Sequence, residues 1–99
     1  MSPVAARVVE TSPSETAYFF VHAQAEPGVM PRVLELFAKR GLVPSNWRSA
    51  VSGADQTGLT IEIEMRGLGG EITAYIAACL RQIASIETVL TSCQGHRAN

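Results

Sequence analysis

The 99-residue sequence predicts an α+β sandwich, in which one antiparallel sheet carries two helices on the same face. Three observations lead to this prediction. A strictly alternating segment, LTIEIEMR, spans residues 59–66; two segments have apolar residues at helical spacing; and each helical segment is preceded and followed by a run typical of a strand. The element order is therefore strand, helix, strand, strand, helix, strand.

The first strand follows a lead-in. Residues 1–16 have no sustained hydrophobic period and contain several turn formers, so we expect a flexible lead-in there. Residues 17–23, AYFFVHA, are aromatic and β-branched, which favours a central strand covered at least partly on both faces. If Tyr18 and Phe20 share the outer face, they suit either a protein contact or a partly exposed strand.

The segment AEPGVMPRVLELFAKRGL, residues 25–42, predicts the first helix. Proline is tolerated in the first turn, as at Pro31, because the amide that it removes has no intrahelical partner. Apolar residues then follow at helical spacing: Val33, Leu34, Leu36 and Phe37. Lys39 and Arg40 suit the negative end of the helix, and Gly41 suits the left-handed residue beyond it.

The middle of the sequence predicts a hairpin. Residues 42–51 form a looser strand, and Pro44 near its start indicates a sheet edge, because proline cannot donate to a ladder. The turn SGADQTG leads into the alternating strand, whose inward residues are Leu59, Ile61, Ile63 and Met65. Glu62 and Glu64 share its outer face, and we interpret them as solvated rather than as a catalytic carboxylate pair.

The sequence GLGG interrupts the chain before the second helix. An apolar stripe at helical spacing predicts that helix: Ile72, Ile76, Cys79, Leu80 and Ile83. A short strand, residues 86–90, and a polar tail, residues 93–99, complete the chain. Two strand-helix-strand halves joined by a hairpin make the ferredoxin-like arrangement, with the folded domain expected over residues 17–92.

The composition restricts the classes of function. Charged residues are 17 % of the chain, below the roughly 25 % usual for soluble proteins, and 46 % of residues are hydrophobic, so some apolar surface is expected to lie against a partner. The net charge of −1 argues against nucleic acid and anionic membranes. The longest apolar run, AYFFV, is too short to span a bilayer, and the opening lacks an apolar signal core. We therefore expect a cytoplasmic protein.

Neither catalysis nor a metal centre is predicted. A nucleophile needs a base within reach, but His22 lies in the first strand and His96 in the tail, neither in a recognisable motif. Cys93 and His96 lack the paired spacing of a zinc site, and Cys79 and Cys93 are expected to stay reduced. We expect no catalytic residue, no metal and no cofactor; a small stand-alone enzyme is the least favoured alternative.

Residues 17–92 resemble an ACT domain. The resemblance lies in the strand AYFFVHAQA, the segment EPGVMPRVLELFAKRGL, the following PSNWRSAV and GLTIEIEMRG, and the closing LRQIASIETVL. Within that family, PGVMPRVLELFAKRG and LRQIASIETV are most similar to the short small regulatory subunits of acetolactate synthase. The resemblance implies a non-catalytic regulatory subunit that activates a separate catalytic large subunit in branched-chain amino-acid biosynthesis.

The resemblance also implies a homodimer and an effector site. ACT domains commonly pair through their second strands and bind an amino acid between the first loop of one copy and the edge strand of its partner. On this pattern the dimer edge includes Pro44, Asn46 and Trp47. The ligand-binding residues are Ala25, Glu26, Pro27, Gly28, Val29, Met30 and Val43.

Individual residues both favour and weaken this effector site. Since Gly28 has no side chain, a ligand carboxylate can approach the amides of Gly28, Val29 and Met30 at the positive end of the helix. However, Ala25 stands where ligand-binding members of the family often carry Asn or Asp. Val43 stands where they often carry Asn. Losing two hydrogen bonds weakens binding by roughly 5- to 150-fold. The alternative is an ACT module that dimerises and binds no small molecule.

Overall fold

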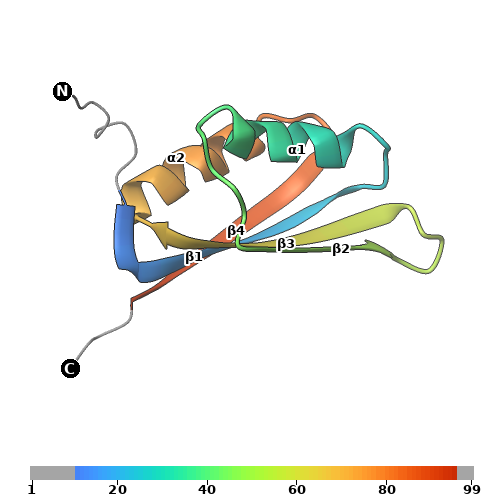
Figure 1. Ribbon diagram of the computed structural model, residues 1–99. Helices are drawn as coiled ribbons and strands as arrows, with labels where there is room; N and C mark the ends of the chain where they lie inside the picture. Colours follow the sequence, from blue (N-terminus) through green and yellow to red (C-terminus); the bar gives the residue numbers. More distant parts are fainter. Residues whose placement is uncertain (1–10, 96–99) are drawn as a thin grey trace.

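The computed structural model describes residues 11–95 (Figure 1). Its elements, in chain order, are β1 (Thr11–Gln24), α1 (Val29–Ala38), β2 (Asn46–Ser52), β3 (Gly58–Leu68), α2 (Gly70–Leu80) and β4 (Ile86–Gly95). Neighbouring strands are antiparallel, in the order β2-β3-β1-β4, and both helices cover one face of the sheet, which confirms the predicted βαββαβ sandwich. Within this part of the chain, no helix is long and apolar enough to cross a membrane.

The core lies between the two helices and the inner face of the sheet. β1 and β3 contribute alternate residues to it, which confirms the period of two in residues 59–66. α1 contributes Val29, Val33 and Phe37, and the ring of Phe37 packs edge to face on Phe19, with 5.5 Å between the ring centroids. These buried contacts fix α1 against β1 and thereby position the start of the helix.

Two strands, β1 and β4, extend beyond the predicted domain of residues 17–92. Residues 11–16, expected to be flexible lead-in, belong to β1, and residues 93–95, expected to be polar tail, belong to β4. The physical reason is pairing between these two segments, since Glu15 lies opposite Gly95. Such long-range pairing leaves no trace in local composition. The rest of the predicted lead-in and tail, including His96, lies outside the described residues.

The first helix and the strand after it follow the prediction with two differences. Gly41 adopts the left-handed conformation expected after the helix, with a φ of +71°. β2 lies at a sheet edge as predicted, but it begins at Asn46, after Pro44. Leu34, predicted on the apolar side, is 46 % exposed because the buried line of α1 runs through Phe37 at a spacing of four residues.

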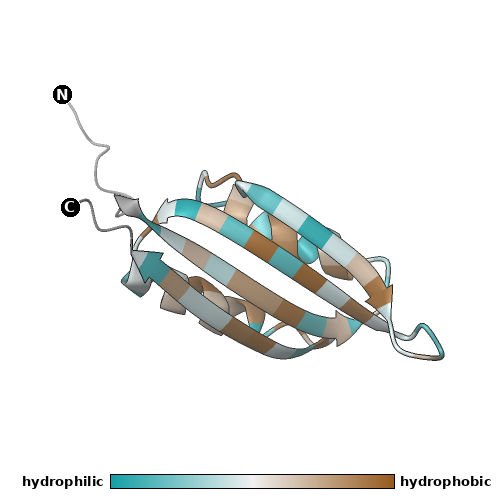
Figure 2. Ribbon diagram, turned by 90° about the horizontal axis from the view of Figure 1, so that it is seen from below, coloured by the Kyte–Doolittle hydropathy of each residue, from teal (hydrophilic) through white to brown (hydrophobic). Residues whose placement is uncertain are grey.

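The other face of the sheet is not covered by either helix, and hydrophilic and hydrophobic residues are interspersed along its strands (Figure 2). We call it the open face. Cross-strand register places Tyr18 beside Glu64 and Phe20 beside Glu62, as expected for outer positions. Phe20 is 44 % exposed, and its neighbour across the β1–β4 ladder, Leu90, is 65 % exposed. Apolar surface on this face is therefore available to bind another molecule.

Candidate functional site

The loop between β1 and α1 is held from two sides. The amide of Gln24 donates to the Ser85 carbonyl at 2.9 Å, and the amide of Ala25 donates to the Thr57 carbonyl at 2.8 Å. The Ser85 hydroxyl also donates to Glu26 Oε1 at 2.5 Å. The loop is thus tied to the α2–β4 turn and to the β2–β3 hairpin, and these ties set where α1 begins.

The first turn of α1 presents backbone donors. Gly28 is the N-cap, and no side chain of the described residues caps the helix with a hydrogen bond. Of the three amides predicted to bind a carboxylate, that of Val29 donates to the Glu26 carbonyl at 3.1 Å and closes a turn. The amides of Gly28 and Met30 have no acceptor within the described part of the chain. Two donors at the positive end of the helix dipole, rather than three, are therefore available to an anion.

The space around Gly28 is open. Its φ of −81° is ordinary for any residue, and a Cβ built there would meet no atom within 4 Å. Neither backbone conformation nor packing among the described residues therefore requires glycine. What the missing side chain does is leave the two available amides uncovered, as a close backbone approach by a ligand would need.

The predicted ligand-binding residues do not all meet within one chain. The loop residues before Gly28 are exposed, and Met30 after it is 36 % exposed. Val43, by contrast, lies beyond the other end of α1 and is 82 % exposed. The ten-residue helix between the two groups is about 15 Å long. Val29 offers no side chain to a ligand, because it is buried in the core.

A shallow hollow of about 700 Å³ lies beside this loop, toward the tip of the β2–β3 hairpin. Ala25 and Glu26 line it, but the other predicted ligand-binding residues do not. Glu87 from β4 adds a second carboxylate to its wall. Because carboxylates accept hydrogen bonds, these two side chains suit a ligand's ammonium group.

The hairpin tip beside this hollow is ordered by Asp55. Its Oδ1 accepts hydrogen bonds from the Thr57 hydroxyl at 2.9 Å and from the Thr57 amide at 3.3 Å. The hydrogen bond from the Thr57 hydroxyl, and then the hydrogen bond from the Thr57 amide, lower the pKa of the Asp55 carboxyl below its ordinary value. The ionised carboxylate thus steadies the residue whose carbonyl receives the Ala25 amide.

β2 and β4 form the two edges of the sheet. In β4, Nη2 of Arg81 donates to the Val89 carbonyl at 2.7 Å, so a side chain occupies an acceptor of that edge strand. In β2, Asn46 lies on the open face and Trp47 lies on the helix side, half-buried against the core. Pro44 precedes the strand and is half-buried. Of the three predicted dimer-edge residues, only Asn46 is exposed.

The described residues contain no arrangement that points to catalysis or metal binding. His22 is exposed on the open face, opposite Thr60 and Thr88 in cross-strand register. Both cysteines are free thiols, Cys79 half-buried and Cys93 exposed. Among residues 11–95, no group of three His, Cys, Asp or Glu side chains is placed to hold a metal ion.

Sequence reasoning found the glycine at the start of α1 but missed the residues that hold the loop. Ser85 and Thr57 are ordinary turn residues in the sequence, and each contacts the loop only through the fold. Arg81, which covers part of the β4 edge, carries no motif either. No local signal in a single sequence identifies the Ser85 and Thr57 contacts, since they join segments far apart in the chain.

Comparison with known proteins identifies this arrangement. The sequence profile of the ACT-like domain family matches residues 11–98. The C-terminal domain of the MgtC protein from Mycobacterium tuberculosis is similar in structure, with 15 % sequence identity, a TM-score of 0.66, and 89 % of this chain and 96 % of that chain covered. The ACT domain of GTP pyrophosphokinase from Chlorobium tepidum in solution has 11 % identity and a TM-score of 0.64, covering 80 % of this chain and 88 % of that chain.

The regulatory subunit of aspartate kinase from Thermus thermophilus, in its ligand-free form, is also similar. It has 12 % identity and a TM-score of 0.60, with 87 % of this chain and 57 % of that chain covered. At such identities the likeness concerns the fold. No curated protein matches the chain in sequence. The family profile nevertheless spans all six elements and the loop before α1, and on that basis the protein belongs to the ACT-like domain family.

Proposed function

We propose that the protein is a non-catalytic regulatory subunit, a homodimeric ACT-like domain that binds a small amino acid at the start of α1 and acts on a separate catalytic subunit. The observation that carries this proposal is the uncapped helix start. Gly28 and Met30 present two amides without acceptors among residues 11–95, and the space above Gly28 is open there. A carboxylate is the group that such donors bind most strongly.

A second copy completes the site in this proposal. Val43 and Gly28 of one chain are separated by the length of α1, so a ligand that contacts both must lie between two chains. Pairing through the edges of β2 supplies such an arrangement. It is favoured over pairing through β4, because Arg81 already occupies the Val89 carbonyl there.

The proposed binding is weak. Two charge-assisted hydrogen bonds of about 1.5–3 kcal/mol each sum to about 3–6 kcal/mol, which corresponds to a Kd between about 6 mM and about 40 μM. Ala25 and Val43 offer no polar side chain to the ammonium group of the ligand. Glu26 carries the charge that would suit it, but its carboxylate already accepts a hydrogen bond from Ser85.

The proposed catalytic partner is an acetolactate synthase-type large subunit in branched-chain amino-acid biosynthesis. Support comes from the segments PGVMPRVLELFAKRG and LRQIASIETV, which resemble the short small subunits of that enzyme. Valine or a similar amino acid is then the expected effector. Mixing the protein with an acetolactate synthase large subunit from the same organism should raise the activity of the large subunit, and an unchanged activity would contradict this assignment.

Calorimetric titration with valine, leucine, isoleucine, serine and phenylalanine tests the effector site, with light scattering on the same sample. We expect heat from a branched-chain ligand and the mass of a dimer. Gly28→Val should lower the heat by covering the amides, while the fold is retained because a Cβ there meets no atom of the described residues. Gly95→Val is the matched control, since its Cβ also meets no atom and it lies at the end of β4. Equal heat from wild type and Gly28→Val would contradict the site.

The second candidate function is a dimerisation module that binds no small molecule. Two observations favour it. The Val29 amide already donates a hydrogen bond to the Glu26 carbonyl, and the side chains of Ala25 and Val43 are apolar and offer no hydrogen bond to a ligand. A dimer mass without heat from any of the amino acids would support this candidate over the first. A monomer mass would contradict both.

A further inference from the structure

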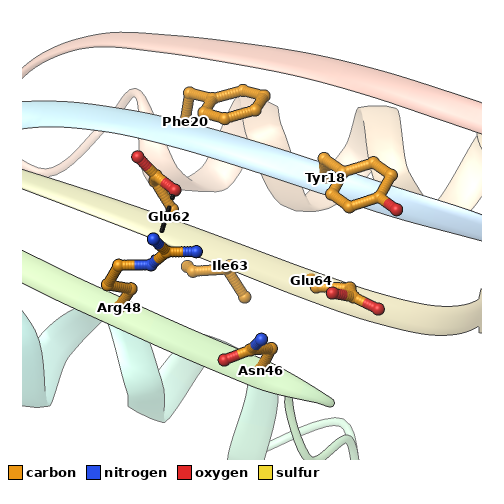
Figure 3. A pocket seen from close by; sticks show the side chains of 7 residues that line it. All are labelled: Tyr18, Phe20, Asn46, Arg48, Glu62, Ile63 and Glu64. Carbon is orange, nitrogen blue, oxygen red and sulfur yellow. Dashed lines mark ion pairs between the residues drawn. The ribbon is translucent and has the colours of Figure 1, made fainter.

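The open face contains a hollow of about 190 Å³ that takes no part in the proposed effector site. It is formed by β1, β2 and β3, and its main lining side chains are Tyr18, Phe20, Asn46, Arg48, Glu62 and Glu64 (Figure 3). None of them belongs to the loop before α1. The hollow is smaller than the roughly 300–1,000 Å³ typical of sites for drug-sized ligands, so a ligand of this hollow would be small.

Arg48 supplies a cation whose terminal hydrogen-bond donors are available to a ligand. Its Nε lies 3.8 Å from Glu62 Oε1, and the two side chains are 76 % and 51 % exposed, so this ion pair contributes little to stability. Its terminal guanidinium nitrogens form no hydrogen bond within the described part of the chain. A guanidinium presents a planar fork of donors that fits a carboxylate. Arg48 can therefore keep Glu62 near Nε and bind a second carboxylate through its terminal nitrogens.

Glu64 supplies the opposite charge. Its side chain is 24 % exposed, which makes it more buried than that of Glu62. Its Oε2 lies 3.4 Å from Nε of Arg66, and Oε1 is left without a partner among the described residues. Cross-strand register places Glu64 between Tyr18 and Asn46, whose side chains can also accept a hydrogen bond. This corner of the hollow suits an ammonium group.

The two rings of β1 supply an apolar wall. Tyr18 and Phe20 lie along one side of the hollow, opposite Asn46 and Arg48 on β2 (Figure 3). Phe20 is 44 % exposed, which leaves its ring accessible to an aliphatic or aromatic group. Leu90 extends the same apolar surface on β4. Covering these side chains would remove apolar area from water and favour binding.

We infer that this hollow binds a small zwitterion with an apolar side group, whose carboxylate is held by Arg48, whose ammonium group is held by Glu64, and whose side group lies on Tyr18 and Phe20. The two charges set the specificity. A ligand with one of them leaves either the guanidinium or the carboxylate without its partner and binds more weakly. The site differs from the start of α1 in residues and in the face of the molecule.

Amide-resolved NMR titration of the full chain tests this inference. The ligands are L-leucine, isoamylamine, which lacks the carboxylate, and 4-methylpentanoate, which lacks the ammonium group. We expect leucine to shift the amide signals of Phe20, Arg48 and Glu64 at millimolar concentration. Each analogue should bind about tenfold more weakly than leucine, because one charge-assisted contact is lost.

Variants separate this site from the one at α1. Arg48→Met and Glu64→Gln should each weaken leucine binding about tenfold without loss of fold, since both side chains lie on the open face. Arg32→Met is the control, because it removes an exposed arginine from α1. The open face of this variant should bind leucine with the affinity of wild type. Gly28→Val should leave the shifts of the open face unchanged, whatever it does to binding at α1.

Three results would overturn the inference. The first is leucine-induced shifts confined to Gly28 and Met30, or no shifts at all. The second is equal affinity for leucine and either analogue, or unchanged affinity in Arg48→Met. The third is loss of dimer mass in Phe20→Ser, which would identify the open face as a contact between copies of the chain.

Discussion

The two faces of the sheet use the same strands for different purposes. On the helix side, Phe19, Ile61 and Ile63 are at most 1 % exposed and form the core. One residue further along the same strands, Phe20 is 44 % exposed and Glu62 is exposed as well. The inner face therefore carries stability, while the open face is available for recognition. Substitutions at adjacent positions should separate these two roles.

The largest effect is expected from Phe19→Ala, which should lower the free energy of unfolding by about 3–5 kcal/mol. Phe19 is fully buried and packs on the ring of Phe37, so its removal leaves a cavity. Phe20→Ala is the matched control on the open face and should cost less than about 1 kcal/mol. Urea unfolding of the three proteins measures both values. Equal losses would contradict the division between the faces.

The two ends of α1 allow a similar comparison between glycines. Gly41→Ala should cost about 1–2 kcal/mol, because φ is +71° and the left-handed conformation is unfavourable for a residue with a Cβ. Gly28→Ala should stay within about 0.5 kcal/mol, because its φ is −81° and the space is open, so the lower entropy of the unfolded variant offsets the poorer N-cap propensity of alanine. Thermal and urea unfolding compare the two. A large loss in Gly28→Ala would show that Gly28 has a structural role.

The two edges of the sheet are distinguished by Arg81. Arg81→Met removes the hydrogen bond to the Val89 carbonyl and should lower the free energy of unfolding by about 1 kcal/mol, less than a buried charged bond because Arg81 is exposed. It also frees an acceptor of β4, so light scattering should detect larger assemblies. Arg32→Met is the control and should change neither quantity. An unchanged mass in Arg81→Met would indicate that something other than Arg81 prevents the β4 edge from pairing with another chain.

The smallest effect concerns the hairpin tip. Because hydrogen bonds from Thr57 lower the pKa of Asp55 below 3.8, ionised Asp55 stabilises the folded state. That contribution is present above pH 3.8 and is lost as the pH falls through the lowered pKa. The difference in Tm between wild type and Asp55→Asn should therefore shrink in acid. A difference that is constant with pH would exclude a role for this titration.

The sequence predicts the parts of the fold that depend on local pattern. Alternation in residues 59–66 and apolar spacing in α1 and α2 each reflect a face buried within one element. The extension of β1 to Thr11 could not be predicted, because it depends on pairing with β4 far along the chain. Leu34 was misplaced because spacing alone does not fix the width of the buried stripe.

The candidate site is predictable to a similar extent. Gly28 stands out in the sequence because glycine between two prolines at a helix start is unusual, but the bond from the Val29 amide to Glu26 depends on turn geometry. On the open face, the alternation of inward and outward residues in β1 and β3 places Tyr18 near the carboxylates of Glu62 and Glu64. The position of Arg48 beside them depends on the register between β2 and β3, which no local pattern determines.

The measurement that tests the central claim most directly is an NMR titration with L-valine, followed at the amides of Gly28, Val29 and Met30. The account predicts that the signals of Gly28 and Met30 move downfield as they bind the carboxylate, whereas that of Val29 moves less because it already donates to Glu26. Signals that stay in place for all three amides, with shifts elsewhere or nowhere, would contradict an effector site at the start of α1.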